Sequence, residues 1–189
     1  KDYFTIKKGF KWITNYLSRK RSHLIRSEYD CILSTSKSIN KDNSLLNCRL
    51  NGFNDNKPDL IIIDLKFKIR KKLTLFKKFK KRRIFIITSN FKSKKILYFK
   101  KKGIKIIHIK SLETKFDFIL LFKILKKYGY NRLLVESGLI FLNTLIRNKL
   151  ISNLYVFKSP KKLGKIGVNN STNKLIKKVN LKKKIKVNL

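Results

Sequence analysis

Residues 60–64 read LIIID and residues 84–88 read IFIIT, and these two runs decide the fold class. Their apolar residues are continuous rather than alternating, as expected for strands that are covered on both faces. Further strands are predicted at residues 30–36, 104–108, 133–136 and 153–159. Because helical periods separate these runs, we predict an α/β protein with a mostly parallel sheet and flanking helices.

Helices are predicted at residues 15–29, 92–102, 116–130 and 138–146. Thr14 can accept hydrogen bonds from the first N–H groups of the first helix, and Gly129 can end the third. Residues 40–59 are rich in Asn, Asp and Gly and are predicted to form a loop. Residues 66–83 and 174–189 are Lys-dense and are interpreted as connectors or edge segments. With no internal repeat, residues 1–189 are taken as one domain.

The formal net charge of +39 is typical of proteins that bind phosphate-rich partners such as RNA. However, Ala, Gln and Met are absent, whereas Lys, Asn, Ile, Leu and Phe, which have A/T-rich codons, fill the sequence. A mutationally biased genome would give this AT-rich composition whatever the function. The charge is therefore a weak indicator, and nucleic acid is not the favoured partner.

Cys31 and Cys48 do not form a CxxC pair, so we expect reduced thiols in a cytoplasmic protein. No apolar run approaches the about 18–20 residues of a membrane span. No Cys, His or Asp spacing resembles a zinc site, so no metal is expected. The chain starts at Lys1 without Met, and we expect it to be a segment of something longer.

Ligands of α/β sheets bind beyond the carboxyl ends of the strands. Asp64, Thr88-Ser89 and Glu136-Ser137-Gly138 follow predicted strands and are candidates for this position. At Gly138 the N–H groups of a helix start lie beside a small residue, so a phosphate could approach. On pattern alone, a cap formed by Glu136 or Ser137 is an equally good interpretation.

Histidine and arginine are two further candidate residue types. His108 follows a predicted strand, and such a histidine is more often structural than catalytic. Arg26 and Arg49 stand out in a chain that uses Lys almost everywhere, because arginine makes bidentate contacts to phosphate or carboxylate that lysine cannot make. Other arginines dilute that argument: Arg19, Arg21, Arg70, Arg82, Arg83, Arg132 and Arg147.

Eight short motifs resemble, in order and spacing, the reductase domain of the bifunctional deaminase/reductase of riboflavin biosynthesis. They are KDYFT (1–5), WIT (12–14), HLIR (23–26), DCIL (30–33), SINKDNSLLNCR (38–49), IIID (61–64), VESG (135–138) and SPKKLG (159–164). The resemblance implies a dihydrofolate-reductase-like fold. The chain departs from the family pattern at Tyr3, Phe10, Asn43-Ser44, Leu65 and Ser137.

The resemblance also implies site residues. Substrate positions are Arg26, Leu46, Arg49 and Glu136. Nicotinamide-cofactor positions are Trp12, Ser38 and Asp42, and the NADPH phosphates fall at Gly138, Leu139, Ile140, Phe141, Leu142, Asn143 and Thr144. The catalytic residues stay unassigned. Lys66 or Lys68, which follow Asp64, are a hypothesis for the 2′-phosphate of the cofactor.

The implied reaction is the NADPH-dependent reduction of 5-amino-6-(5-phosphoribosylamino)uracil to its ribitylamino form. A phosphorylated small molecule would then be the substrate, and the family commonly forms homodimers. The resemblance further implies that the first strand and a zinc deaminase domain lie before residue 1, in a multifunctional enzyme. Two alternatives stay open: a degenerate homologue that no longer turns over, and a basic RNA-binding protein.

Overall fold

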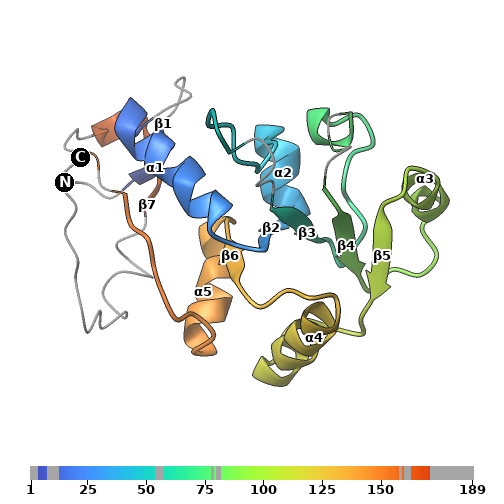
Figure 1. Ribbon diagram of the computed structural model, residues 1–189. Helices are drawn as coiled ribbons and strands as arrows, with labels where there is room; N and C mark the ends of the chain where they lie inside the picture. Colours follow the sequence, from blue (N-terminus) through green and yellow to red (C-terminus); the bar gives the residue numbers. More distant parts are fainter. Residues whose placement is uncertain are drawn as a thin grey trace. The chain divides into compact units, whose positions relative to one another are not determined.

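The computed structural model describes residues 4–7, 13–53, 58–77, 79, 82–157, 159 and 163–170. The chain divides into two compact units, of which the first comprises residues 1–22 and 142–189 and the second comprises His23–Phe141 (Figure 1). The second unit contains the large sheet and most of the predicted site. No helix among the described residues is long and apolar enough to cross a membrane.

The second unit is built on a sheet of five parallel strands. They are β2 (Cys31–Thr35), β3 (Asp59–Ile63), β4 (Ile84–Thr88), β5 (Lys105–His108) and β6 (Leu133–Val135), in the order β5-β4-β3-β2-β6. The strands predicted in these five places are confirmed. From β2 to β5 each new strand is added next to the previous one, in one direction. The chain then crosses back and adds β6 on the other side of β2.

Both faces of this sheet are covered, which explains the continuous apolar runs. On one face Leu60, Ile62 and Ile86 belong to a core that also includes Ile39 of α2 and Phe99 of α3. This face carries α2 (Ser36–Asp42) and α3 (Lys95–Lys101). Adjacent strand residues point to the opposite face. The five core residues named above are fully buried, with 0% of their surface exposed.

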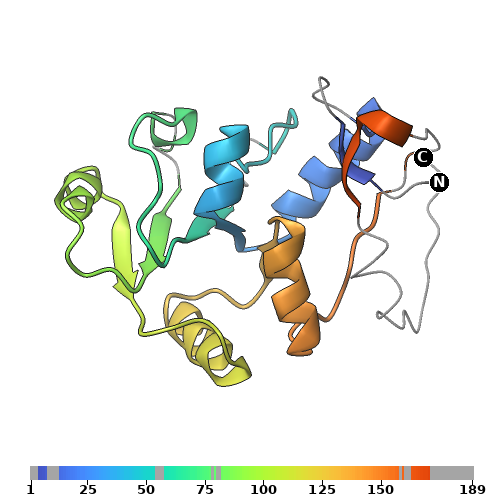
Figure 2. The same cartoon turned by 180° about the vertical axis from the view of Figure 1, so that it is seen from behind.

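The opposite face is covered by α4 (Lys115–Lys127). There the ring of Phe85 packs edge-on against Tyr128 and Tyr130, with centroids 4.9 and 5.8 Å apart. Figures 1 and 2 show α4 on the other side of the sheet from α2 and α3. The return crossover from β5 to β6 requires this placement, since parallel crossovers are right-handed. The predicted α/β fold with flanking helices is therefore confirmed.

The helix ends follow local hydrogen bonding. Helix α4 begins at a capping box. Thr114 Oγ1 accepts from the Asp117 N–H, and Asp117 Oδ2 accepts from the Thr114 N–H. The helix ends before Gly129, whose φ of +91° only glycine adopts easily, as predicted. Helix α3 is shorter than the predicted 92–102, because Asn90 and Ser93 accept from backbone N–H groups before it starts.

Two predictions about helix boundaries are corrected. Helix α1 (Tyr16–Ser27) is capped by Asn15, whose Oδ1 accepts from the Ser18 N–H at 2.8 Å, and not by the Thr14 side chain. Residues 40–42, predicted as loop, complete α2. The N-cap of α2 is Thr35, at the carboxyl end of β2.

The Lys-dense stretch 66–83 is more than a connector. Leu73, Leu75 and Phe76, around the short 3-10 helix η1 (Thr74–Phe76), are at most 3% exposed and join the core. The sequence did not predict that these apolar residues join the core, because a lysine-rich composition indicates a solvated segment. Cys31 and Cys48 are both buried free thiols.

The first unit contains a two-stranded antiparallel sheet of β1 (Phe4–Lys7) and β7 (Gly167–Asn170). The 3-10 helix η2 (Gly164–Ile166) precedes β7, and α5 (Leu139–Arg147) ends in this unit. The predicted strand at 153–159 is wrong over its described residues, which form no strand. Its β-forming side chains Tyr155 and Val156 are 44% exposed, so no apolar face is buried there.

Candidate active site

Strands β2 and β6 are parallel neighbours, so their carboxyl ends meet at one edge of the sheet, where the predicted site falls. Glu136 follows β6 directly. Its backbone N–H donates to the carbonyl of Leu33 at 3.0 Å, and its carbonyl accepts from Ser34 Oγ at 2.6 Å. These two bonds fix the backbone of Glu136 against β2, and so they fix where its side chain starts.

The Glu136 carboxylate forms a bidentate ion pair with Arg26, near the end of α1. Arg26 Nε donates to Glu136 Oε1 at 2.6 Å, and Nη2 donates to Oε2 at 2.7 Å. The two side chains are only 13% and 24% exposed. Both carboxylate oxygens bond to the guanidinium, so the described side-chain contacts of Glu136 are with Arg26 and not with the N–H groups of α5.

His23 and Arg49 complete a cluster around the backbone carbonyl of Asn47. His23 Nδ1 lies 3.0 Å from this carbonyl, and Arg26 Nη1 donates to the same oxygen at 3.1 Å. Arg49 donates from Nη2 toward His23 Nε2 at 3.3 Å and from Nη1 to the Asn47 side chain at 3.3 Å. The structure thus brings the predicted residues Arg26, Arg49 and Glu136 together and adds His23.

The charges in this cluster do not cancel. Glu136 neutralises Arg26, whereas Arg49 lies on the surface with neutral partners. Burial and the nearby positive charge of Arg26 both lower the pKa of Arg49 from its ordinary value. One surplus positive charge beside an oriented carboxylate suits a ligand that offers hydrogen-bond donors at one end and an anion at the other.

Leu46, a predicted substrate residue, is buried and has a left-handed backbone with φ of +49°. Arg82 holds this loop: its Nη1 donates to the carbonyl of Leu46 at 2.7 Å and its Nη2 donates to that of Leu45. Burial lowers the pKa of Arg82 to about 10. Sequence analysis missed this residue, because nothing distinguishes Arg82 from the basic residues beside it.

Ser38 and Gly138, two predicted cofactor residues, are in contact. The Gly138 N–H donates to Ser38 Oγ at 3.1 Å, and the same oxygen accepts from Thr35 Oγ1 at 3.1 Å. These bonds tie the start of α2 to the turn that precedes α5. A Cβ at Gly138 would lie 3.7 Å from Ser38 Oγ, an ordinary contact, and the φ of Gly138 is not left-handed. The protein itself therefore does not require glycine at this position.

The remaining predicted cofactor residues are distributed as follows. Asp42 is exposed at the last turn of α2. Leu139, Ile140 and Phe141 form the first turn of α5, and Phe141 packs on Phe118 with ring centroids 6.1 Å apart. Leu142, Asn143 and Thr144 continue the helix into the first unit. Trp12 lies outside the described residues.

The other strand-end candidates have structural partners. The buried Asp64 carboxylate accepts from Ser36 Oγ at 2.8 Å and from the N–H groups of Lys68 and Ile69 at 2.8 and 2.7 Å. Thr88 and Ser89 both donate to the carbonyl of Leu65. These residues shape the turn after β3, in which the side chains of Lys66 and Lys68 are exposed.

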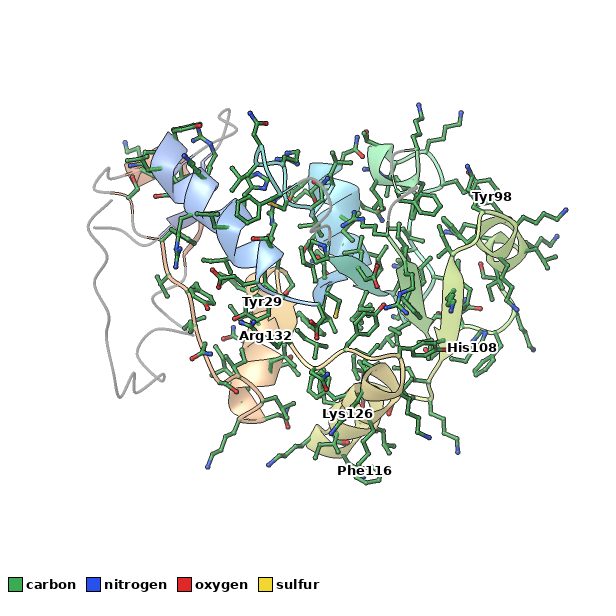
Figure 3. All side chains as sticks on the ribbon, in the orientation of Figure 1. Tyr29, Tyr98, His108, Phe116, Lys126 and Arg132 are labelled. Atoms are coloured by element: carbon green, nitrogen blue, oxygen red, sulfur yellow. The ribbon has the colours of Figure 1, made fainter. Side chains whose placement is uncertain are left out.

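His108 lies at the other edge of the sheet, on β5, away from β2 and β6 in strand order (Figure 3). Its ring stacks on Phe91 with centroids 4.3 Å apart. Among the described residues its Nδ1 is the one buried side-chain nitrogen or oxygen with no hydrogen-bond partner. The structure gives His108 no place in the cluster around Glu136.

Comparisons with known proteins all lead to one protein family. The family model described as "RibD C-terminal domain" matches residues 5–187. A riboflavin biosynthesis protein RibD from Buchnera aphidicola subsp. Baizongia pistaciae is 30% identical over 167 residues, covering 82% of this chain and 43% of the relative. A protein named 5-amino-6-(5-phosphoribosylamino)uracil reductase from Buchnera aphidicola subsp. Acyrthosiphon pisum is 30% identical over 165 residues, covering 82% and 77%.

Solved structures show the same fold. RibD from Acinetobacter baumannii superposes with a TM-score of 0.64 at 15% identity, covering 91% of this chain and 48% of that one. The riboflavin biosynthesis reductase Rib7 from Saccharomyces cerevisiae gives a TM-score of 0.63 at 21% identity, covering 90% and 73%. The chain therefore spans about half the length of the RibD proteins that it matches, or somewhat less.

Proposed function

The chain belongs to the RibD C-terminal domain family, and on this premise we propose that it reduces 5-amino-6-(5-phosphoribosylamino)uracil to 5-amino-6-(5-phosphoribitylamino)uracil with NADPH. The name of the Buchnera reductase, which is 30% identical to this chain, supports the substrate. The proposal extends to a cytoplasmic enzyme that acts on a phosphorylated small molecule and that forms a homodimer.

One observation carries this proposal: the Arg26–Glu136 pair and the Ser38–Gly138 contact lie at the same sheet edge, beyond β2 and β6. The first is a carboxylate held rigidly beside a surplus positive charge. The second is a helix start approached by a hydroxyl group. Hydride transfer between two bound molecules needs a substrate site and a cofactor site that are adjacent, as these two features are.

In this proposal the substrate is bound by the cluster around Asn47. The Glu136 carboxylate accepts hydrogen bonds from ring or amino N–H groups of the pyrimidine, and Arg26 keeps its two oxygens in a fixed plane. Arg49 binds the phosphate, because no carboxylate among the described residues pairs with its guanidinium. Leu46, held by Arg82, forms an apolar wall.

The residues present fit a nicotinamide cofactor. Gly138 has no side chain at the start of the nine-residue helix α5, so a phosphate group could approach the positive end of this helix. Ser38, Asp42, Leu139, Ile140 and Phe141 would bind the cofactor, together with Trp12, Leu142, Asn143 and Thr144. The exposed Lys66 or Lys68 would bind the 2′-phosphate that distinguishes NADPH from NADH. When bound, NADPH supplies the hydride.

The test is to purify the full-length protein and titrate it with NADPH while following the fluorescence of Trp12, the chain's one tryptophan. We expect saturable quenching, with weaker binding of NADH. Oxidation of NADPH at 340 nm should then require the phosphoribosylamino pyrimidine. Saturable NADPH binding without turnover would favour the degenerate homologue, and absence of both would contradict the proposal.

An RNA-binding assay tests the remaining alternative. Because the charge follows composition, we expect RNA affinity to fall steeply with salt and to show no preference among sequences. Tight RNA binding at physiological salt, by a protein that does not bind NADPH, would replace the reductase proposal with the RNA-binding one.

A further inference from the structure

The partners of His23 determine which of its ring nitrogens carries the proton. Nδ1 lies 3.0 Å from the carbonyl of Asn47, which can only accept, and 3.4 Å from Nη1 of Arg26, which can only donate. Because Arg26 Nη1 donates to the same Asn47 carbonyl at 3.1 Å, the shorter contact assigns the hydrogen to Nδ1. Nε2 lies 3.3 Å from Nη2 of Arg49, which can only donate, so Nε2 is the acceptor. His23 is therefore a neutral imidazole that accepts from Arg49 on one side and donates to the loop carbonyl on the other.

The charged groups that face His23 oppose its protonation. Arg26 comes from one turn further along α1, and its Nη1 lies 3.4 Å from Nδ1. Arg49 comes from the loop after α2, and Glu136, the one acidic group of the cluster, is already paired with Arg26. Burial and the two guanidinium groups lower the pKa of His23 from its ordinary value of 6.5, and the Asn47 hydrogen bond and Glu136 only partly offset this.

The spacing on α1 explains how one helix face serves both partners. His23 and Arg26 are three residues apart and therefore lie on the same face of the helix. Arg26 orients Glu136, whereas His23 reaches Arg49. Arg49 itself is on the surface, and its other described contact is a 3.3 Å bond to Asn47, two residues away. Without His23 the guanidinium would keep only this local contact.

We propose that His23 is a positioning residue, whose neutral ring holds the Arg49 guanidinium in the orientation that binds the substrate phosphate. This inference rests on the proposed function, since it assigns His23 to the same substrate site. It goes beyond the site residues that the family resemblance implies, which include Arg26 and Arg49 and do not include His23. In this proposal the Nε2 acceptor, and not the Nδ1 donor, is the ring nitrogen on which phosphate binding depends.

Two conservative variants separate the two sides of the ring. In His23→Gln the side-chain oxygen can take the place of Nε2 and accept from Arg49. In His23→Asn the side-chain amide can take the place of Nδ1 and donate to the Asn47 carbonyl, but nothing accepts from Arg49. If His23 only stabilised the Asn47 loop, the Asn variant would be normal and the Gln variant impaired. A positioning role predicts the reverse order.

The measurement is KM for the phosphorylated pyrimidine, together with inhibition by ribose 5-phosphate and by ribose, at pH 8. We expect His23→Asn to weaken binding of ribose 5-phosphate about tenfold, as when one charge-assisted hydrogen bond is lost. His23→Gln should stay within about threefold of the wild type. Ribose and NADPH should bind all variants alike, and His108→Asn, which alters the other histidine, should leave every value unchanged.

Two further measurements test the proposal: a double variant and the tautomer of His23. In an Arg49→Met background, His23→Asn should add no further loss, because its effect acts through Arg49. Nitrogen NMR of the ligand-free protein should show the Nδ1–H form of His23, and the Nε2–H form would overturn the proposal. An active wild type with a normal His23→Asn variant, or equal losses in both variants, would also overturn it. An inactive wild type would instead refute the proposed function.

Discussion

Arg26 and Glu136, which are 110 residues apart in the chain, are joined by two hydrogen bonds of 2.6 and 2.7 Å. The pair is a rigid unit, because Arg26 is anchored on α1 and by the Asn47 carbonyl, and the Glu136 backbone is bonded to β2. A carboxylate at the edge of a sheet does not need an arginine for the strand to form. The pairing therefore serves the orientation of the carboxylate more than the stability of the sheet.

Replacing Glu136 with Gln should abolish substrate use while the fold survives. We expect kcat/KM to fall by at least about 100-fold, as for the loss of a charged hydrogen bond to substrate. Unfolding free energy should fall by only about 1 kcal/mol, since the pair is partly exposed and the amide still accepts one bond from Arg26. Urea denaturation and steady-state kinetics measure the two effects.

The control for this variant is Glu28→Gln, which alters an exposed glutamate just after α1. It should change neither activity nor stability. If Glu136→Gln instead unfolded the protein, the carboxylate would be a structural element and its assignment to the substrate would be wrong.

Arg82 and its neighbour Arg83 should differ sharply in their effect on stability. Arg82→Met leaves the carbonyls of the half-buried Leu45 and the buried Leu46 without their donor, so we expect a loss of about 2–4 kcal/mol in unfolding free energy. Arg83, 49% exposed in its pair with Asp59, should cost about 0–1 kcal/mol when replaced by Met. Urea denaturation compares the two variants directly, and equal losses would contradict the role given to Arg82.

Gly138→Ala should impair cofactor binding without affecting the fold. The added Cβ meets Ser38 Oγ at 3.7 Å and the backbone is not left-handed, so the melting temperature should not change. The methyl group would stand where a phosphate approaches the start of α5, and we expect NADPH affinity to fall about tenfold or more. Trp12 fluorescence and thermal melting give the two readings.

Gly129→Ala is the control, and it should lower stability without changing NADPH binding. Its φ of +91° strains any residue with a side chain, so stability should fall by about 1 kcal/mol while NADPH binding is unchanged. Normal NADPH binding by Gly138→Ala would remove the helix start from the cofactor site.

The lowered pKa of His23 predicts how stability depends on pH. Between its folded-state pKa and the ordinary value of 6.5, the unfolded chain binds more protons than the folded one. This contribution to stability is therefore fully present above pH 6.5 and is lost as the pH falls through the folded-state pKa. His23→Gln has no titrating ring, so its stability should depend less on pH in this window.

The measurement is the urea midpoint of both proteins from pH 5 to pH 8, with His108→Gln as the comparison variant. A parallel pH dependence of the wild type and His23→Gln would show that His23 is not held neutral by its surroundings.

Much of the fold follows from local pattern. Ile61 and Ile87 lie in apolar runs that only a sheet covered on both faces can bury, and Gly129 ends α4 because its backbone is left-handed. The strand and helix-end predictions are confirmed because they depend on residue types at short spacing. The structure also brings Arg26, Arg49 and Glu136 together, and their assignment to a substrate site stays a prediction.

Tertiary structure decided what each polar group contacts. Asp64 and Glu136 both directly follow strands of the sheet, yet the Asp64 carboxylate bonds to the turn after β3 and the Glu136 carboxylate bonds to Arg26. Residues 153–157 have the composition of a strand and form none, and no strand of the described part of the chain pairs with them.

The sequence by itself therefore determined the α/β class, the strands of the main sheet and the residue types of the site. Only the tertiary structure decided that Arg26 pairs with Glu136, that Arg82 holds the Leu46 loop and that His23 is a neutral acceptor for Arg49. The physical reason is that hydrogen bonds and ion pairs depend on distances between groups that are far apart in the chain, whereas propensity and periodicity act over a few neighbouring residues.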